Sequence, residues 1–396
     1  MAATRLSTAR GVFVFSSTIV GAGILALPVI ASQAGFPPLA VMIIILAVVS
    51  ALSGLYIAEA VLAESEPLHL PTLAGRHLGP WGARAMFAGI IVYTYGALLG
   101  YLAAGGQIIF ALSAGAIPVW AGTVVYFAVA ALILHRGMAA VSRVNTYLMY
   151  VMLTLLAILI ITAAPKVQVP LLARSDWRAS FDVFGIVLFA YLGHSVLPSI
   201  AFNLADRTRI VTVIAVGIAL PGLLYLLWSL TVIGVVPATA ANGNSLSAAL
   251  AAGQPATIPL GYVLGGSVIL LGNVFAALST MTSFIGFGVS LKDAYADRAE
   301  RRGRVVPGLA VTALVVLPPL IVALLKPDIF DESLAIAGTF GGGLFVGVLP
   351  ALIVTRVRRA NPYRPVTALR RFFPYVVLSV YVLGMLYALA ESFGWL

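Results

Sequence analysis

Residues 18–23 read Thr18-Ile19-Val20-Gly21-Ala22-Gly23 and lie in the middle of an apolar stretch, residues 11–31, that is long enough to cross a bilayer. Glycine is a poor helix former, because it loses the most backbone entropy on folding. A helix in lipid must satisfy its own backbone hydrogen bonds, so two glycines beside three hydroxyl side chains predict an interruption at mid-membrane. Interrupted helices of this kind form the binding sites of secondary transporters. The alternative interpretation is that the glycines let a neighbouring helix pack closely.

The composition of the whole chain is that of a helical membrane protein. Of its 396 residues 61% are hydrophobic and 9% are charged, and there is no cysteine, which excludes disulfides and thiolate metal sites. Apolar stretches predict a single transmembrane domain over residues 1–396 with eleven membrane-spanning helices and no strands. These helices are expected near 10–32, 37–63, 81–113, 117–134, 143–164, 181–203, 209–236, 256–290, 305–325, 331–355 and 373–394.

The basic residues predict the orientation of these helices in the membrane. With the N-terminus in the cytoplasm, only four of the 23 lysines and arginines fall outside: Lys166, Arg174, Arg178 and Lys326. Cytoplasmic loops of membrane proteins are rich in such residues, so the sequence predicts an internal N-terminus and an external C-terminus. The net charge of +10 is therefore a topology signal and does not indicate nucleic-acid binding. The arginines in residues 298–304 could also contact anionic lipid headgroups.

A second interruption is predicted in the sixth helix. Gly193, His194 and Ser195 follow an apolar run at mid-depth, and Pro198 comes four residues after the histidine. The sixth helix comes five helices after the first, and because five is an odd number, two consecutive blocks of five helices have opposite orientations in the membrane. Interrupted helices at equivalent places in inverted halves indicate a transporter site. The halves are expected at about 10–164 and 181–355, with an additional helix at about 373–394.

Charged residues are missing from the middle of the predicted helices. All thirteen acidic residues lie in loops or near helix ends, and Glu59 is the nearest to a carboxylate within the membrane. A binding site must therefore use backbone groups, hydroxyls, aromatic rings and His194. An intramembrane enzyme is not expected, because the histidine has no carboxylate near it in the sequence.

The motif from Thr18 to Pro28 resembles the first helix of the amino acid/auxin permease group, and within it the bacterial aromatic and hydroxy amino acid permeases. The resemblance continues through Gly193-His194-Ser195-Val196-Leu197-Pro198-Ser199, Met281-Thr282-Ser283-Phe284 with Lys292-Asp293, and Gly341-Gly342-Gly343 to Leu349-Pro350-Ala351. It implies a leucine-transporter-like fold of the APC superfamily, with two inverted five-helix repeats and a peripheral eleventh helix. It also implies ion-coupled import of an amino acid across the cytoplasmic membrane by alternating access. The oligomeric state stays open.

The two interruptions suit an amino acid zwitterion. The carboxylate could bind the N–H groups of Val20, Gly21, Ala22 and Gly23, where a half-helix begins. The ammonium group could bind carbonyl oxygens of Ser17, Thr18, Tyr191 and Leu192. Selectivity could come from side chains that face the same cavity; the candidates are Tyr95, Tyr101, His194, Ser195, Phe275, Thr339 and Phe340. Each aromatic residue could instead serve in packing, and His194 could be a structural hydrogen-bonding residue.

The eighth helix suggests a coupling ion. Ser279, Thr282 and Ser283 are similar in spacing to the sodium ligands of sodium-coupled transporters of that fold, and carbonyls of Ser17 and Val20 would complete the ligand set. The fifth helix has no lysine, the residue that replaces the ion in some proton-coupled relatives. Sodium is therefore the favoured ion, and a proton is the alternative. The hydroxyls could also be simple hydrogen-bonding groups between helices.

The sequence leaves two other functions open, an uncoupled facilitator or channel and an amino acid sensor. No cofactor is expected beyond the coupling ion.

Overall fold

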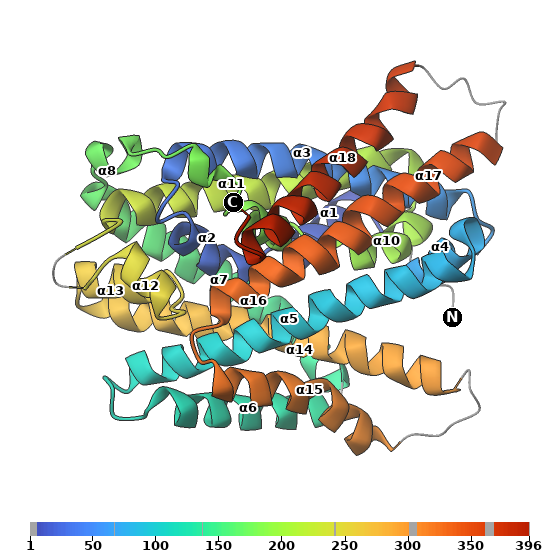
Figure 1. Ribbon diagram of the computed structural model, residues 1–396. Coiled ribbons are helices and arrows are strands. Elements are labelled where there is room, and N and C mark those ends of the chain that lie inside the picture. Colours follow the sequence, from blue (N-terminus) through green and yellow to red (C-terminus); the bar gives the residue numbers. More distant parts are fainter. Residues whose placement is uncertain are drawn as a thin grey trace.

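The computed structural model describes residues 6–66, 68–136, 138–240, 243–300, 307–360 and 368–395. Within these ranges the secondary structure is helical, apart from two isolated bridges, Leu6 with Leu204 and Gly35 with Ser175. The long helices lie side by side along one common direction (Figure 1), and the N-terminus lies at one end of the bundle, on the right of the view. This end is called the N-terminal end below.

The helices are, in chain order, α1 (Thr8–Ile19), α2 (Gly23–Ile30), α3 (Phe36–Leu62), α4 (Leu70–Leu78), α5 (Pro80–Leu112), α6 (Val119–Arg136), α7 (Met138–Ala163), η1 (Ala164–Lys166), α8 (Val169–Ala173), η2 (Arg178–Ser180), α9 (Phe184–Ala190), η3 (His194–Val196), α10 (Leu197–Asn203), η4 (Arg207–Arg209), α11 (Ile210–Val235), α12 (Leu246–Ala251), α13 (Thr257–Leu264), α14 (Ser267–Glu300), α15 (Gly308–Leu325), α16 (Phe330–Ile336), η5 (Ala337–Val348), α17 (Leu349–Ala360) and α18 (Ala368–Ser392).

The apolar helices agree with a protein that crosses the membrane many times. Among the described residues nine helical stretches are long and apolar enough to span it, and a tenth is formed if α1 and α2 count as one span bent by 52°. A shorter apolar helix, Val119–Leu134, lies where the sequence predicts the fourth span. Arg301, Arg302 and Arg304, the expected lipid-headgroup contacts, lie outside the described residues.

The predicted eighth span, residues 256–290, is wrong in its bounds. The structure divides it at Gly265 and Gly266, whose φ angles of 69° and 55° turn the chain between α13 and α14. Left-handed backbone of this kind suits glycine, because a Cβ atom would be strained there. The spanning helix therefore begins at Ser267 and continues to Glu300.

The tenth span contains an unusual helix. Between α16 and α17 the backbone forms a π-helix, η5, which includes Gly341, Gly342 and Gly343. A π-helix hydrogen-bonds from residue i to i+5 and is rare, and it is frequently found at functional sites. The segment packs on α5, α9 and α18, so it lies against the interrupted sixth helix.

The centre of the bundle holds the two half-helices α2 and α9. Residues from Gly23 to Val29 and every residue of α9 are buried. Helices that are apolar all round are typically buried in the core of a bundle. The interruptions predicted from sequence thus adjoin the most buried segments of the molecule.

Candidate functional site

The first interruption lies at the residues that the sequence predicts. α1 ends at Ile19, Val20 adopts extended backbone with φ −71° and ψ 96°, and α2 begins at Gly23. The last backbone hydrogen bond of α1 runs from Val20 N–H to the Ser16 carbonyl, at 2.8 Å. The hydroxyls of Ser17 and Thr18 donate to the Val14 carbonyl, at 3.0 and 2.8 Å, and so stay on their own helix.

The second interruption follows α9. Helix α9 ends at Ala190, and Gly193 N–H then donates to the Tyr191 carbonyl at 3.1 Å, a hydrogen bond across three residues in place of the helical pattern. The short helix η3 begins at His194. This segment therefore lacks regular helical hydrogen bonds at the same level of the bundle as the first interruption.

Glycine lets the two interruptions approach one another closely. A Cβ atom on Gly23 would lie 2.9 Å from Ala190 Cα, and one on Gly193 would lie 2.6 Å from Ile19 Cγ1. Real Cβ atoms do not approach other heavy atoms so closely, so these two glycines permit contact between the interrupted helices. Gly23 thus does allow a neighbouring helix to pack closely, as the alternative interpretation states. That neighbouring helix is α9, the other interrupted helix.

One tyrosine hydroxyl joins both helix ends. Tyr225, on α11, lies with its hydroxyl 2.9 Å from the Ile19 carbonyl oxygen and 2.7 Å from the Ala190 carbonyl oxygen. Both carbonyls belong to the last residue of a helix, where no helical N–H is available to them. A hydroxyl has one proton, so it can donate fully to only one of the two carbonyls at a time. Sequence reasoning missed Tyr225; the only signal is a hydroxyl at mid-depth in the seventh span.

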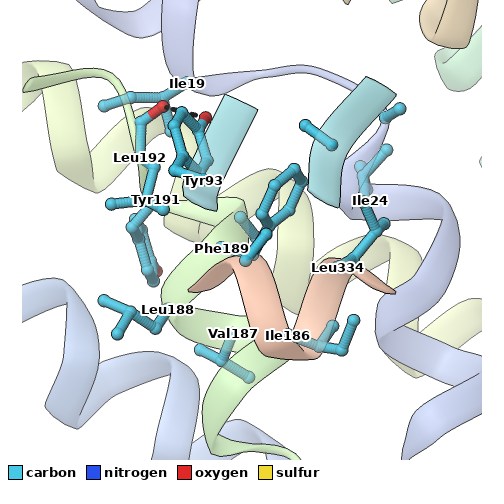
Figure 2. Packing of buried hydrophobic residues seen from close by; sticks show 14 of the residues in the cluster. Ile19, Ile24, Tyr93, Ile186, Val187, Leu188, Phe189, Tyr191, Leu192 and Leu334 are labelled. Atoms are coloured by element: carbon cyan, nitrogen blue, oxygen red, sulfur yellow. Dashed lines mark hydrogen bonds between the residues drawn. The ribbon is translucent and has the colours of Figure 1, made fainter. Parts of the chain in front are cut away.

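A second tyrosine binds the sixth helix. The Tyr93 hydroxyl donates to the Leu192 carbonyl at 3.3 Å, and Figure 2 shows its ring beside Leu192 and Phe189. Tyr93 and Tyr101 are eight residues apart on α5 and therefore share one helix face. The sequence predicts Tyr101 and Tyr95 as binding residues on this helix, and the Tyr95 hydroxyl contacts the Tyr295 hydroxyl at 3.2 Å and the Leu314 carbonyl at 2.8 Å. Those contacts place Tyr95 toward α14 and α15.

Four rings gather beside the interruptions, from α5, α9 and α14. We call Tyr93, Tyr101, Phe189 and Phe287 the aromatic cluster. Their ring centroids are 5.4 Å apart for Tyr93 and Phe189, 5.0 Å for Tyr93 and Phe287, 6.4 Å for Tyr101 and Phe189, and 6.1 Å for Tyr101 and Phe287. Phe287 is partly exposed and was not selected from sequence, although it lies one helical turn after Ser283.

Ser283 links the aromatic cluster to the first interruption. A Cβ atom on Gly21 would lie 2.9 Å from Ser283 Oγ, and Ala22 N–H donates to the same oxygen at 3.4 Å. The Tyr101 side chain also interacts with Ser283. Among the residues considered as sodium ligands, Ser283 is thus the one whose side chain contacts the first interruption.

Thr282 faces a different helix. Its hydroxyl donates to the Leu278 carbonyl at 2.8 Å and lies 3.7 Å from the sulfur of Met152 on α7. Ser279 Oγ is buried, and no partner for it is found among the described residues. The Thr282 hydroxyl in this conformation is therefore directed toward its own helix and toward α7.

His194 is buried and bound to the neighbouring helix. Its Nε2 lies 2.9 Å from the Ser50 carbonyl on α3, so Nε2 carries the proton, because a carbonyl can only accept. Its ring meets Phe15 edge-on at 6.0 Å. These contacts fit the structural role that the sequence left open for this residue.

The remaining candidates are spread around the interruptions. Ser195 is exposed, Phe275 packs on Trp228 at 6.2 Å between ring centroids, and the Thr339 side chain contacts Gly185 on α9. The Tyr191 ring contacts Tyr225 at 5.4 Å. Phe275 and Ser195 therefore make no contact with the aromatic cluster that the structure records.

Glu59 is held in an ion pair. Both of its carboxylate oxygens accept from Arg358 on α17, at 3.0 and 2.7 Å, and the guanidinium lies 5.4 Å from the centre of the Tyr56 ring. A bidentate pair of this kind is strong and directional. It connects the ends of α3 and α17 at the N-terminal end of the bundle.

Comparison with known proteins gives a consistent assignment. The model of the tryptophan/tyrosine permease family matches residues 4–388. A tyrosine-specific transport system 1 of Haemophilus influenzae is 25% identical over 90% of both chains. A tryptophan-specific transport protein of Pseudomonas aeruginosa is 24% identical over 90% of this chain and 87% of its own length. A glutamine transporter 2 of Aliivibrio fischeri is 23% identical over 86% of this chain and 87% of its own.

Proposed function

The chain belongs to the tryptophan/tyrosine permease family, and on that premise we propose that it transports aromatic amino acids across the bacterial cytoplasmic membrane. It is a multi-pass membrane protein whose family and relatives are permeases and transport proteins and not enzymes. We propose a leucine-transporter-like arrangement with eleven spans, inverted repeats at about 10–164 and 181–355, and an internal N-terminus. Transport then proceeds by alternating access.

The observation that carries the proposal is the meeting of the two interrupted helices at Tyr225. Its hydroxyl serves carbonyls from both helix ends with a single proton, so one of the two lacks a full donor. Such carbonyls suit an ammonium group, which brings three donors. The Val20 and Ala22 N–H groups already donate to the Ser16 carbonyl and to Ser283 Oγ, so the amino acid carboxylate would bind the N–H groups of Gly21 and Gly23, at the start of α2.

The aromatic cluster accounts for an aromatic substrate. Aromatic rings favour edge-to-face and offset contacts with centroids about 4.5–7 Å apart. Tyr93, Tyr101 and Phe189 are buried around the interruptions, whereas Phe287 is partly exposed. In the proposed binding mode the substrate ring joins this cluster, and Phe287 is the ring that moves to admit it.

Coupling to an ion is the next part of the proposal. Sodium is the proposed ion, held at Ser283 with carbonyl oxygens of Ser17, Val20 and Ser279. Thr282 joins that set only if its side chain turns away from Met152. The position of Ser283 Oγ beside Gly21 supports this site. A proton is the alternative coupling ion.

Uptake by the purified protein in proteoliposomes tests this function. Radiolabelled tryptophan, tyrosine, phenylalanine, glutamine and leucine are compared under an imposed sodium gradient, an imposed pH gradient and no gradient. We expect accumulation of an aromatic amino acid above its external concentration under one gradient. Equilibration without accumulation would indicate a facilitator, binding without uptake would indicate a sensor, and preference for glutamine would overturn the aromatic assignment.

A further inference from the structure

Asp331 is a carboxyl side chain that is buried without a hydrogen-bond partner. It lies in the first turn of α16, its residue is 3% exposed, and neither carboxyl oxygen has a partner among the described residues. The sequence places it near the end of a span, where an acidic residue is expected to reach water. In the structure it is instead enclosed.

Among the described residues, no ion pair of Asp331 is found. The elements that pack most on α16 are α2, α5, α9 and η5, and three of them, α2, α9 and η5, contain no titratable or charged residue. On α5 the contacts to α16 include Gly96 and Gly100, and this helix carries Tyr93, Tyr95 and Tyr101. Its one charged residue, Arg84, is twelve positions before Gly96 and so about 18 Å away along the helix axis.

The neighbouring charges in the chain are engaged elsewhere. Lys326 pairs with Glu332 on the surface, and Asp328 is exposed. A buried carboxylate with no cation and no donor beyond its own backbone N–H is very unfavourable, so the group must be neutralised by a bound cation. A proton is the cation that needs no further ligand, and no group of three or more His, Asp or Glu that could hold a metal is found in the described part of the chain.

We propose that Asp331 is a proton-binding site of the transport cycle, occupied when α16 is packed as in this structure. The step is the binding of one proton to one carboxylate, which gives a neutral carboxyl group. The inference rests on the proposed transport function and adds a proton to it, whether or not sodium also binds at Ser283.

The packing of α16 connects this site to the interruptions. A Cβ atom on Gly185 would lie 2.6 Å from the Ala335 carbonyl oxygen, so α16 and α9 are in direct backbone contact. Gly185 lies five residues before Ala190, where α9 ends. A charged Asp331 needs water, which cannot enter while α16 is packed on α2 and α9. Release of the proton therefore favours separation of these helices, and proton binding favours their closure.

The test compares Asp331→Asn with Glu332→Gln, its exposed neighbour, in proteoliposomes that contain a pH-sensitive dye. We expect the native protein and Glu332→Gln to accumulate tryptophan under a pH gradient and to move protons with it. We expect Asp331→Asn to exchange tryptophan across the membrane within about twofold of the native rate. Its accumulation under a pH gradient should fall at least about tenfold, because the amide is always neutral.

The outcomes separate the two proposals. Proton-driven accumulation by Asp331→Asn equal to that of the native protein overturns the assignment of Asp331. Failure of the native protein to bind or transport any aromatic amino acid overturns the proposed function, and the proton site with it. A further measurement uses only the native protein, so that misfolding of a variant cannot affect it. Tryptophan added to the protein in weakly buffered detergent solution should change the number of bound protons by up to one per molecule. No change in bound protons contradicts the proposal.

Discussion

The hydroxyl of Tyr225 lies 2.7 Å from the carbonyl oxygen of Ala190, the residue at which α9 ends. The same hydroxyl lies 2.9 Å from the Ile19 carbonyl, so a residue of α11 holds together the ends of two helices that are 171 residues apart in the chain. Backbone groups at interrupted helix ends need partners in a membrane. Tyr225 supplies that partner without a charge.

Replacing Tyr225 with phenylalanine should weaken both folding and binding. The change leaves two buried carbonyls without a donor, which costs about 1–3 kcal/mol of stability. The affinity for tryptophan should fall by about tenfold, because the helix ends are no longer held in place. Thermal unfolding and equilibrium binding measure the two effects. Tyr262→Phe is the control, because Tyr262 is 46% exposed; equal losses in both variants would contradict the role of Tyr225.

Gly21 can be tested by a substitution and its rescue. In Gly21→Ala the added Cβ atom meets Ser283 Oγ, and overpacking of this kind costs about 1–3 kcal/mol. Adding Ser283→Ala removes the oxygen and should restore thermal stability. The same second change should not rescue Gly23→Ala, whose Cβ atom meets the Ala190 backbone.

Gly286 provides the matched control for this series. Nothing lies within 4 Å of a Cβ atom at this position on α14, so Gly286→Ala should stabilise the protein by about 0.5–1 kcal/mol. A loss of uptake in this variant would show that small changes on α14 act without the contact to Gly21.

Tyr93 and Tyr95 make a pair of opposite predictions. Tyr93→Phe loses the hydrogen bond to the Leu192 carbonyl beside the aromatic cluster, and tryptophan affinity should fall about fivefold. Tyr95→Phe loses contacts with Tyr295 and Leu314, so it should lower stability and leave affinity unchanged. Binding titrations of both variants distinguish the two tyrosines, and the reverse pattern would support Tyr95, the residue predicted from sequence.

The sodium site predicts a difference between adjacent residues. If sodium raises tryptophan affinity in the native protein by about fivefold or more, Ser283→Ala should abolish the effect, because ion and substrate stabilise the same arrangement. Thr282→Val should abolish it only if the threonine turns from Met152 toward the ion. Tryptophan titrations with sodium or a large inert cation measure this, and equal native affinity in both salts rules out sodium.

The interruptions could be predicted from sequence because their cause is local. Gly21, Gly23 and Gly193 disfavour helix whatever surrounds them. The partners of the interruptions could not be predicted in the same way. Tyr225 reaches them through packing between helices distant in the chain, and apolar spans carry little periodic signal for the direction in which a side chain points. Ser283 was selected through the resemblance to sodium-coupled transporters, and not from the pattern of its own span.

One prediction from sequence was wrong for a physical reason. An apolar stretch such as 256–290 does not show where a pair of glycines turns the chain, because hydropathy is unchanged across Gly265 and Gly266. The burial of Asp331 could not be predicted, because exposure near the end of a span depends on how other helices cover it. Tyr93 could have been considered from sequence, because it lies eight residues from Tyr101 on one helix face.

The π-helix η5 allows the part of the tenth span that follows it to take two different rotations about the helix axis. A turn bonded from i to i+5 holds one residue more than an α-helical turn, so relaxation of one turn would rotate everything beyond it by roughly 100° about the axis. Arg358 lies beyond η5, on α17, and donates hydrogen bonds to both carboxylate oxygens of Glu59. Rotation of that size would break both hydrogen bonds at once. The Glu59–Arg358 ion pair therefore opposes rotation of the tenth span about its axis. It keeps the same face of the glycine-rich segment packed against α9.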